Sequence, residues 1–166
     1  MFTYLNKQEK DFWLPQLFDL LHDNMSVIAP SGYSYEEEKA KWLAAVSPAL
    51  DKEPRQIIMC IINGQPVGFI QYYIRQDLLM VEEIQIKKEY QKSTMFLQFC
   101  KHMLSVIPED VQTVEAYADK RNKNSINLMG KMGLLALKDE DSSSFVHMRG
   151  SVHKLYSTFR KKSIAK

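Results

Sequence analysis

The middle third of the chain contains three consecutive strand-like stretches separated by short polar turns. Arg55–Ile62 is a nearly continuous apolar run rich in β-branched residues, which is typical of a strand covered on both faces. Asn63-Gly64 follows, and both residues tolerate the positive φ of a type I′ hairpin turn. Pro66–Arg75 predicts a second strand, with Gly68 as a candidate bulge position, and Leu79–Lys88 predicts a third. Tight connections make these strands an antiparallel meander.

Helical spacing of apolar residues predicts two helices before these strands. Asn6 and Glu9 resemble a capping box that would start the first helix, after a short strand at Phe2–Leu5. Pro15 must then lie near the first turn of this helix or kink it, because proline cannot donate a backbone hydrogen bond.

The second helix is predicted to begin at another capping box, formed by Ser34 and Glu37. Its apolar positions recur at helical spacing at Trp42, Leu43 and Val46. We expect this helix to end before Pro48, because proline lacks the donor that would continue it.

Helices and strands alternate after the meander. Thr94–Ile107 places its apolar residues on one helical face, and Val111–Ala118 alternates as a strand. The helical crossover predicts that this strand runs parallel to Leu79–Lys88. Asn122–Met132 predicts another helix, which Gly133 is well placed to close.

The end of the chain adds a strand pair and an amphipathic helix. Leu134–Leu137 and Phe145–Arg149 predict the strands, and Ser151–Lys162 repeats helical spacing. This order of elements predicts an α/β (α+β) fold with a mixed, mostly antiparallel central sheet of about six to seven strands flanked by helices. We expect one domain over residues 1–150 and a helical tail over 151–166 that docks on this domain or on a second copy.

Composition and charge exclude several classes of protein. The chain has 166 residues, 45% hydrophobic and 25% charged, with a net charge of +2, which is ordinary for a soluble globular domain and argues against a nucleic-acid binder. We expect neither a signal peptide nor a membrane span, and hence a cytoplasmic protein. Cys60 and Cys100 lie in apolar runs and are expected to be buried reduced thiols. The spacing of histidines and cysteines predicts no metal site.

The passage from strand to helix over Met80–Phe99 carries the first candidate chemistry. A strand that ends where a helix begins leaves backbone N–H groups pointing one way, with the positive end of the helix dipole behind them. Such a turn binds phosphate, and Lys92, Ser93 and Thr94 can add charge or hydroxyl donors. We interpret Gln91–Phe96 as a pyrophosphate-binding turn rather than only a helix cap.

Three segments, together with the order of elements, resemble the GNAT superfamily of acyl-CoA-dependent N-acetyltransferases. Asn63–Ile70 is similar to the family's central hairpin, Glu82–Tyr90 to its fourth strand, and Asn122–Leu134 to its late Asn-x-x-Ala helix that ends in Gly-Phe. The resemblance implies transfer of an acetyl group from acetyl-CoA to a primary amine of a small molecule or peptide. The protein is expected to act as a monomer or homodimer.

The resemblance also implies which residues contact the cofactor. Backbone groups of the fourth strand pair with the pantetheine amides, the turn holds the pyrophosphate, and the late helix contacts the pantetheine arm. The residues at these positions are Ile84, Gln85, Ile86, Gln91, Lys92, Ser93, Thr94, Met95, Phe96, Asn122 and Ser125. From the residues alone, Asn122 serves equally well as the cap of its helix, with Ser125 in the first turn.

Three positions depart from the family pattern. The family's turn reads Gln/Arg-x-x-Gly-x-Gly/Ala, whereas Thr94 and Phe96 stand here at the small positions. Thr94 is tolerable only with right-handed backbone angles. Met129 stands where many members have a tyrosine proposed to protonate the departing thiolate, and a thioether cannot donate a proton. Tyr117, Tyr90 or water could substitute.

These departures leave a second hypothesis open, in which the chain keeps the fold as a catalytically weak or inactive binding or regulatory module. An open gap beside Leu79–Lys88 would favour the enzyme, whereas a ring of Phe96 filling that gap would favour the module.

Glu82 and Glu83 are the candidate general bases, because an amine must lose a proton before it attacks a thioester. Adjacent strand residues point to opposite faces, so only one of the two is expected in the site unless a bulge re-aims them. The alternative is that both are ordinary solvent-facing or salt-bridged carboxylates.

Overall fold

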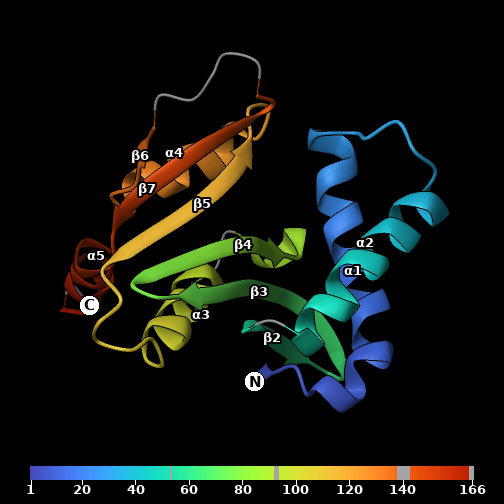
Figure 1. The fold of residues 1–166 in the computed structure, drawn as a ribbon, viewed down its shortest axis with the longest axis horizontal. Coiled ribbons are helices and arrows are strands. Elements are labelled where there is room, and N and C mark those ends of the chain that lie inside the picture. The colour runs from blue at the N-terminus through green and yellow to red at the C-terminus, as the bar shows by residue number, and fades with distance from the viewer. Residues whose placement is uncertain (53, 92–93, 138–142, 165–166) are drawn as a thin grey trace.

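The structure is a computed structural model that describes residues 1–52, 54–91, 94–137 and 143–164, with side chains to Phe159. A seven-stranded sheet runs through the molecule, with helices on both faces (Figure 1). The strands are β1 (Phe2–Tyr4), β2 (Arg55–Ile62), β3 (Gln65–Arg75), β4 (Leu78–Ile86), β5 (Thr113–Asp119), β6 (Leu135–Ala136) and β7 (Phe145–Ser151). The α-helices are α1 (Lys10–Ile28), α2 (Tyr35–Lys52), α3 (Met95–Leu104), α4 (Lys123–Lys131) and α5 (Val152–Ile164), and η1 (Lys7–Glu9) and η2 (Lys88–Tyr90) are short 3₁₀ turns.

The sheet has the strand order β1-β2-β3-β4-β5-β7-β6. β4 and β5 are parallel, and the other neighbouring strands are antiparallel. The predicted fold class is therefore confirmed, as are the meander and the parallel crossover. No described helix combines the length and apolar character needed to cross a membrane.

Two layers of helices cover the two faces of the sheet because the strands alternate. On β3, Phe69 packs with Leu17 of α1, whereas Ile70 points the other way and packs with Phe99 of α3 and Leu155 of α5. Each of these side chains is at most 1% exposed, and burying one contributes roughly 1.5–3 kcal/mol. α1 and α2 lie side by side over β2, β3 and β4 (Figure 1).

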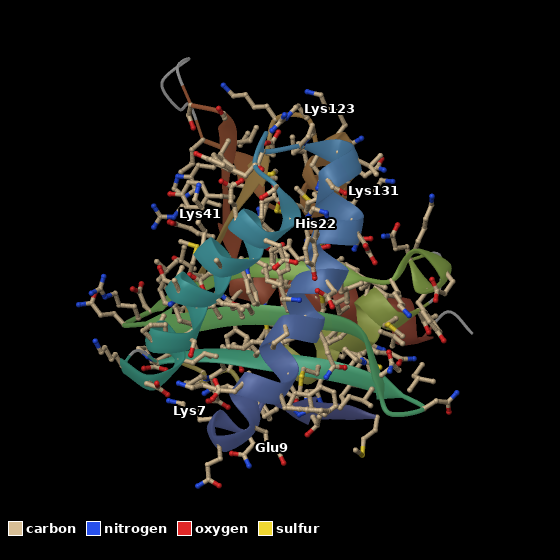
Figure 2. All side chains as sticks on the ribbon, turned by 90° about the vertical axis from the view of Figure 1, so that its right-hand side faces the viewer. Lys7, Glu9, His22, Lys41, Lys123 and Lys131 are labelled. Atoms are coloured by element: carbon tan, nitrogen blue, oxygen red, sulfur yellow. The ribbon has the colours of Figure 1, made fainter. Side chains whose placement is uncertain are left out.

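α1 and α2 also hold each other through polar side chains, which Figure 2 views from their outer side. His22, labelled there on α1, places Nδ1 2.7 Å from Oε2 of Glu38 on α2. The paired helices therefore form one layer, from which Asn24 of α1 reaches the C-terminal end of β4.

The turn residues behave as their backbone preferences require. Asn63 and Gly64 both have positive φ and close the β2–β3 hairpin, as predicted. A register shift between Cys60 and Ile61, opposite Gly68, makes the expected bulge. A Cβ on Gly68 would lie 2.9 Å from the ring of Phe99, so the close approach of β3 to α3 requires glycine there.

Three helix boundaries differ from those predicted. α2 continues through Pro48 to Lys52, because the 2% exposed side chain of Leu50 gains more from burial than one lost hydrogen bond costs. Asn6 caps the 3₁₀ turn before α1 rather than α1 itself. α3 ends at Leu104 instead of Ile107, four residues before Pro108, whose ring would clash with the carbonyl group of Leu104 if the helix continued.

The C-terminal helix α5 docks on the sheet face that carries α3. Val152, Leu155 and Phe159 are each at most 3% exposed within this core. The hydroxyl of Tyr156 donates to the carbonyl oxygen of Leu104. The side chains of the basic residues after Phe159 lie outside the described part of the chain.

Candidate functional site

The candidate site lies where β4 and β5 separate. The two strands pair only from Leu78–Thr113 to Val81–Ala116, after which β4 continues to Ile86 and β5 to Asp119 along diverging paths (Figure 1). A cleft of about 620 Å³ opens between them, and side chains of α1, α3, α4, α5 and β7 complete its walls. A gap beside Leu79–Lys88, the feature that would favour the enzyme over the module, is therefore present.

Alternation along β4 divides the residues of the cleft between the two faces of the sheet. Gln85 lies opposite Phe69, and Glu83 lies opposite Gln71. Cross-strand partners share a face, and Phe69 packs against α1, so Glu83 and Gln85 face the α1–α2 side. Ile84 packs with the core on the α3–α5 side.

The backbone of β4 presents hydrogen-bonding groups to the open side. The N–H of Lys87 donates to the carbonyl oxygen of Val67 on β3 at 2.8 Å. Because strand residues alternate in direction, Ile84 and Ile86 turn their backbone groups away from β3 and toward the cleft. The carbonyl oxygen of Ile86 accepts there from Nε2 of Gln91 at 3.0 Å and from Nδ2 of Asn24 at 3.1 Å.

Glu82 occupies a β-bulge, because the register with β3 passes from Glu83 to Val81 and skips it. Its two carboxylate oxygens accept from Nε and a terminal nitrogen of Arg55, and Gln71 adds a donor at 2.9 Å. The bulge thus turns Glu82 to the same face as Glu83. The other amide atom of Gln71, Oε1, is buried without a hydrogen-bond partner among the described residues.

Glu83 has no such cation beside it in the described structure. It lines the cleft, and its Oε1 accepts from Nε2 of Gln85 at 2.7 Å. Burial raises the pKa of Glu83 to about 7, the charge of Glu82 adds to the rise, and donation from Gln85 opposes it. A carboxylate with a pKa near neutrality can take up and release a proton at physiological pH.

Asn24 of α1 orients the amide of Gln85. Its Nδ2 donates to Oε1 of Gln85 at 2.7 Å, which leaves Nε2 of Gln85 to face Glu83. Reasoning from the sequence missed Asn24, because nothing in its local pattern distinguishes it from other polar positions on α1. The one sequence feature that pointed to a buried polar partner was Gln85, a glutamine between Ile84 and Ile86. Its side chain is 5% exposed in the structure.

The predicted pyrophosphate turn is described only in part, since Lys92 and Ser93 lie outside the described residues. Thr94 is the N-cap of α3 with φ −78° and ψ 2°, so its backbone is right-handed and threonine is unstrained. Met95 is 7% exposed and points into the core. Gln91 and Phe96 line the cleft. The ring centroid of Phe96 lies 6.4 Å from that of Phe159 on α5.

The start of α4 contributes two of the expected residues. Oδ1 of Asn122 accepts from the backbone N–H of Ser125 at 3.1 Å, so Asn122 is a helix cap, and both residues also line the cleft. Met129 lies one turn further along α4 and lines the cleft as well. The family's position for a tyrosine is thus at the cleft and holds a thioether.

Tyr117 of β5 is the tyrosine that reaches the cleft, whereas Tyr90 packs against the core on the α3–α5 side. The Tyr117 ring stacks on His147 of β7, with centroids 4.3 Å apart and planes at 12°. Nε2 of His147 in turn lies 2.9 Å from Oε2 of Glu115. This stack fixes the Tyr117 ring beside the opening.

The chain resembles known proteins in structure but not in sequence. No family model and no curated protein matches its sequence. The PaiA N-acetyltransferase of Thermoplasma acidophilum, solved with coenzyme A, gives a TM-score of 0.69 at 13% identity, over 91% of this chain and 99% of that one. An acetyltransferase from Thermus thermophilus gives 0.70 at 13%, over 91% and 96%. Aminoglycoside 6′-acetyltransferase type Ii gives 0.66 at 12%, over 92% and 97%. The chain therefore has the GNAT fold.

Proposed function

We propose that this protein is an N-acetyltransferase that moves an acetyl group from acetyl-CoA to a primary amine. The observation that carries the proposal is the position of Glu83. Its side chain lines the cleft between the diverging ends of β4 and β5, and burial there raises its pKa. The fold shared with acetyltransferases supports the reaction class, and the geometry of the cleft supports the roles of individual residues.

The edge of β4 fits the amide-bearing arm of coenzyme A. The carbonyl oxygen of Ile86 accepts hydrogen bonds from two side-chain amides on this edge, and an amide N–H of a ligand would replace one of them. Gln91, Asn122 and Ser125 would lie along the same arm. The backbone of Thr94 allows the first turn of α3 to direct its N–H groups outward, which suits a pyrophosphate.

Acetyl-CoA, when bound, supplies a thioester carbon that an amine can attack. A primary amine arrives mainly as an ammonium ion, with a pKa of about 10, so its proton must leave first. Glu83 takes that proton, directly or through one water, and its pKa of about 7 keeps much of it ionised at neutral pH. Backbone N–H groups of Ile84 and Ile86 that face the cleft can stabilise negative charge on the carbonyl oxygen.

Proton donation to the departing sulfur falls to Tyr117 or to water, since Met129 cannot donate. A thiol has a pKa of roughly 8.5, so the thiolate is a fair leaving group without an acid. General acid catalysis contributes about 10²–10⁴-fold where it operates. We therefore expect turnover to be slower than in relatives that have a tyrosine at the Met129 position.

Met129 also favours a second hypothesis, in which the cleft binds acetyl-CoA without turning it over. The two hypotheses agree on binding and differ in chemistry. Under the second, the protein would act as a binding or regulatory module, and Glu83 would have no effect on any rate.

Calorimetric titration with acetyl-CoA, followed by thiol-release assays with a panel of primary amines, tests the proposal. We expect saturable binding and amine-dependent release of coenzyme A that Glu83→Gln slows by about 10²–10⁴-fold. Binding without amine-dependent release would establish the module. Absence of both heat and thermal shift at millimolar acetyl-CoA would reject both hypotheses.

A further inference from the structure

The cleft has a second half, on the α1–α2 side of the sheet. Val114 and Ala116 of β5 pack with the α3–α5 core, so Tyr117, the residue after Ala116, faces the opposite side, the same side as Glu83. Met25 and Ile28 of α1 line the cleft from across the gap. An acceptor placed here reaches Glu83 from the face opposite α3.

An aromatic wall closes this half along β5 and β7. Tyr117 lies opposite His147, and Asp119 lies opposite Phe145, so Tyr117 and Phe145 are diagonal neighbours on one face. Tyr117 is 52% exposed and Phe145 is 49% exposed, yet both line the cleft. Large apolar side chains that remain accessible inside a concave site are available to a ligand.

The charges of the cleft limit what it can hold. The described residues that line it include no lysine, arginine, histidine or aspartate, and its only carboxylates are Glu82 and Glu83. Both oxygens of Glu82 are already bound by Arg55. One carboxylate therefore remains for a ligand, and no described lining cation is available for an anionic ligand.

We propose that the acceptor is a primary monoamine with an uncharged aromatic or apolar body, bound with its amine at Glu83 and its body against Tyr117, Phe145, Met25 and Ile28. The inference rests on the proposed function and adds the substrate class. A polyamine or aminoglycoside would bury further ammonium groups without a carboxylate, and an amino acid or sugar phosphate would bury an anion without a cation. Discrimination of this kind rests on unpaired charge more than on shape.

The test compares phenethylamine, spermidine and lysine as acceptors for the full-length protein with saturating acetyl-CoA. We expect kcat/KM for phenethylamine to exceed the other two by about tenfold or more, since even one methylene gained or lost in an apolar pocket changes kcat/KM by about 10–200-fold. Phe145→Ala should remove most of this preference, and Phe145→Leu should keep part of it. Phe12→Ala, at an exposed aromatic residue of α1 outside the cleft, should leave it unchanged.

The outcomes separate this inference from the proposed function. Faster turnover of spermidine or lysine, or equal loss for all three acceptors in Phe145→Ala, would overturn the substrate class and leave the acetyltransferase standing. Acetyl-CoA binding measured by calorimetry should be the same for wild type, Phe145→Ala and Phe145→Leu. If no amine in the panel is acetylated although acetyl-CoA binds, both the inference and the amine transferase are wrong.

Discussion

Two adjacent glutamates on β4 lie in different surroundings. Glu82 sits on a bulge between Arg55 and Gln71, where its charge is matched by a guanidinium. Glu83 sits one residue further along, at the opening between β4 and β5, where its hydrogen-bonding neighbours are the amide of Gln85 and the backbone N–H of Ile84. The two side chains share a face of the sheet, and burial raises the pKa of Glu83 to about 7.

This difference shows how one strand places two identical side chains in separate surroundings. The ion pair with Arg55 matches the charge of Glu82 and ties β2 to β4. Burial without a described cation raises the pKa of Glu83, so its carboxylate can exchange a proton near neutral pH. The negative charge of Glu82 adds to this rise, so the ion-paired residue tunes the proposed base.

The largest expected effect comes from removing the carboxylate in the cleft. Glu83→Gln keeps the size and the hydrogen bond to Gln85 but cannot accept a proton, so kcat/KM should fall by about 10²–10⁴-fold, measured as initial rates of thiol release. Glu89→Gln, on the exposed 3₁₀ turn η2, is the matched control and should retain activity. A Glu83→Gln enzyme with near wild-type rates would remove Glu83 from the mechanism.

The second effect concerns stability. Arg55→Met leaves the carboxylate of Glu82, whose side chain is 22% exposed, without its cation, and should lower the free energy of unfolding by about 2–3 kcal/mol. Urea denaturation measures it. The double variant Arg55→Met/Glu82→Gln should recover part of this loss, because no unpaired charge remains. Equal stability of the single and double variants would show that the pair is not coupled.

The third effect is on pH dependence. The base must be ionised, so kcat/KM should rise through about pH 7 and level off above it. Glu82→Gln removes the neighbouring negative charge and should move this midpoint to lower pH. Because the pKa of Glu83 is raised from its ordinary value of 4.5, folding stability should fall as pH rises between about 4.5 and 7. This fall should be absent in Glu83→Gln.

The smallest effect reaches Glu83 through two hydrogen bonds. In Asn24→Asp the new carboxylate can only accept, so the amide of Gln85 turns its Nε2 toward α1 and presents Oε1 to Glu83. The protonated form of Glu83 is then favoured, and the midpoint of the pH profile should rise by about 0.5–1 pH unit. Val27→Asp, at an 85% exposed position of α1, adds the same charge without this contact. An equal shift of the midpoint in both variants would show that the added negative charge, and not the hydrogen bonds through Gln85, causes the effect.

Local chemistry made most of the fold predictable. The capping box of Ser34 and Glu37 forms as expected, with Oε2 of Glu37 accepting from the N–H of Ser34 at 2.9 Å. The Asn63-Gly64 turn fixes the hairpin register because few other residue pairs adopt its angles. The prediction that the second helix ends before Pro48 was wrong. There the burial of Leu50, which depends on packing between distant segments, outweighs the local preference of proline.

The site was less predictable because it is assembled from distant segments. The sequence named both Glu82 and Glu83 as candidates on one strand, but the hydrogen bond of Gln85 to Asn24 joins residues 61 positions apart. The bulge that turns Glu82 toward Glu83 depends on how β3 and β4 pair rather than on either sequence alone. Likewise, Met25 and Ile28 have ordinary helical spacing, and only the packing of α1 over β4 brings them to the cleft.

The separation of β4 and β5 leaves two strand edges inside the molecule, and such edges invite pairing with a strand of another chain. Amide side chains of Asn24 and Gln91 already occupy the carbonyl oxygen of Ile86 on one of them. α1 on one side and α4 on the other also narrow the approach. The same features that would admit a slender amide-bearing ligand thus protect the sheet from edge-to-edge aggregation.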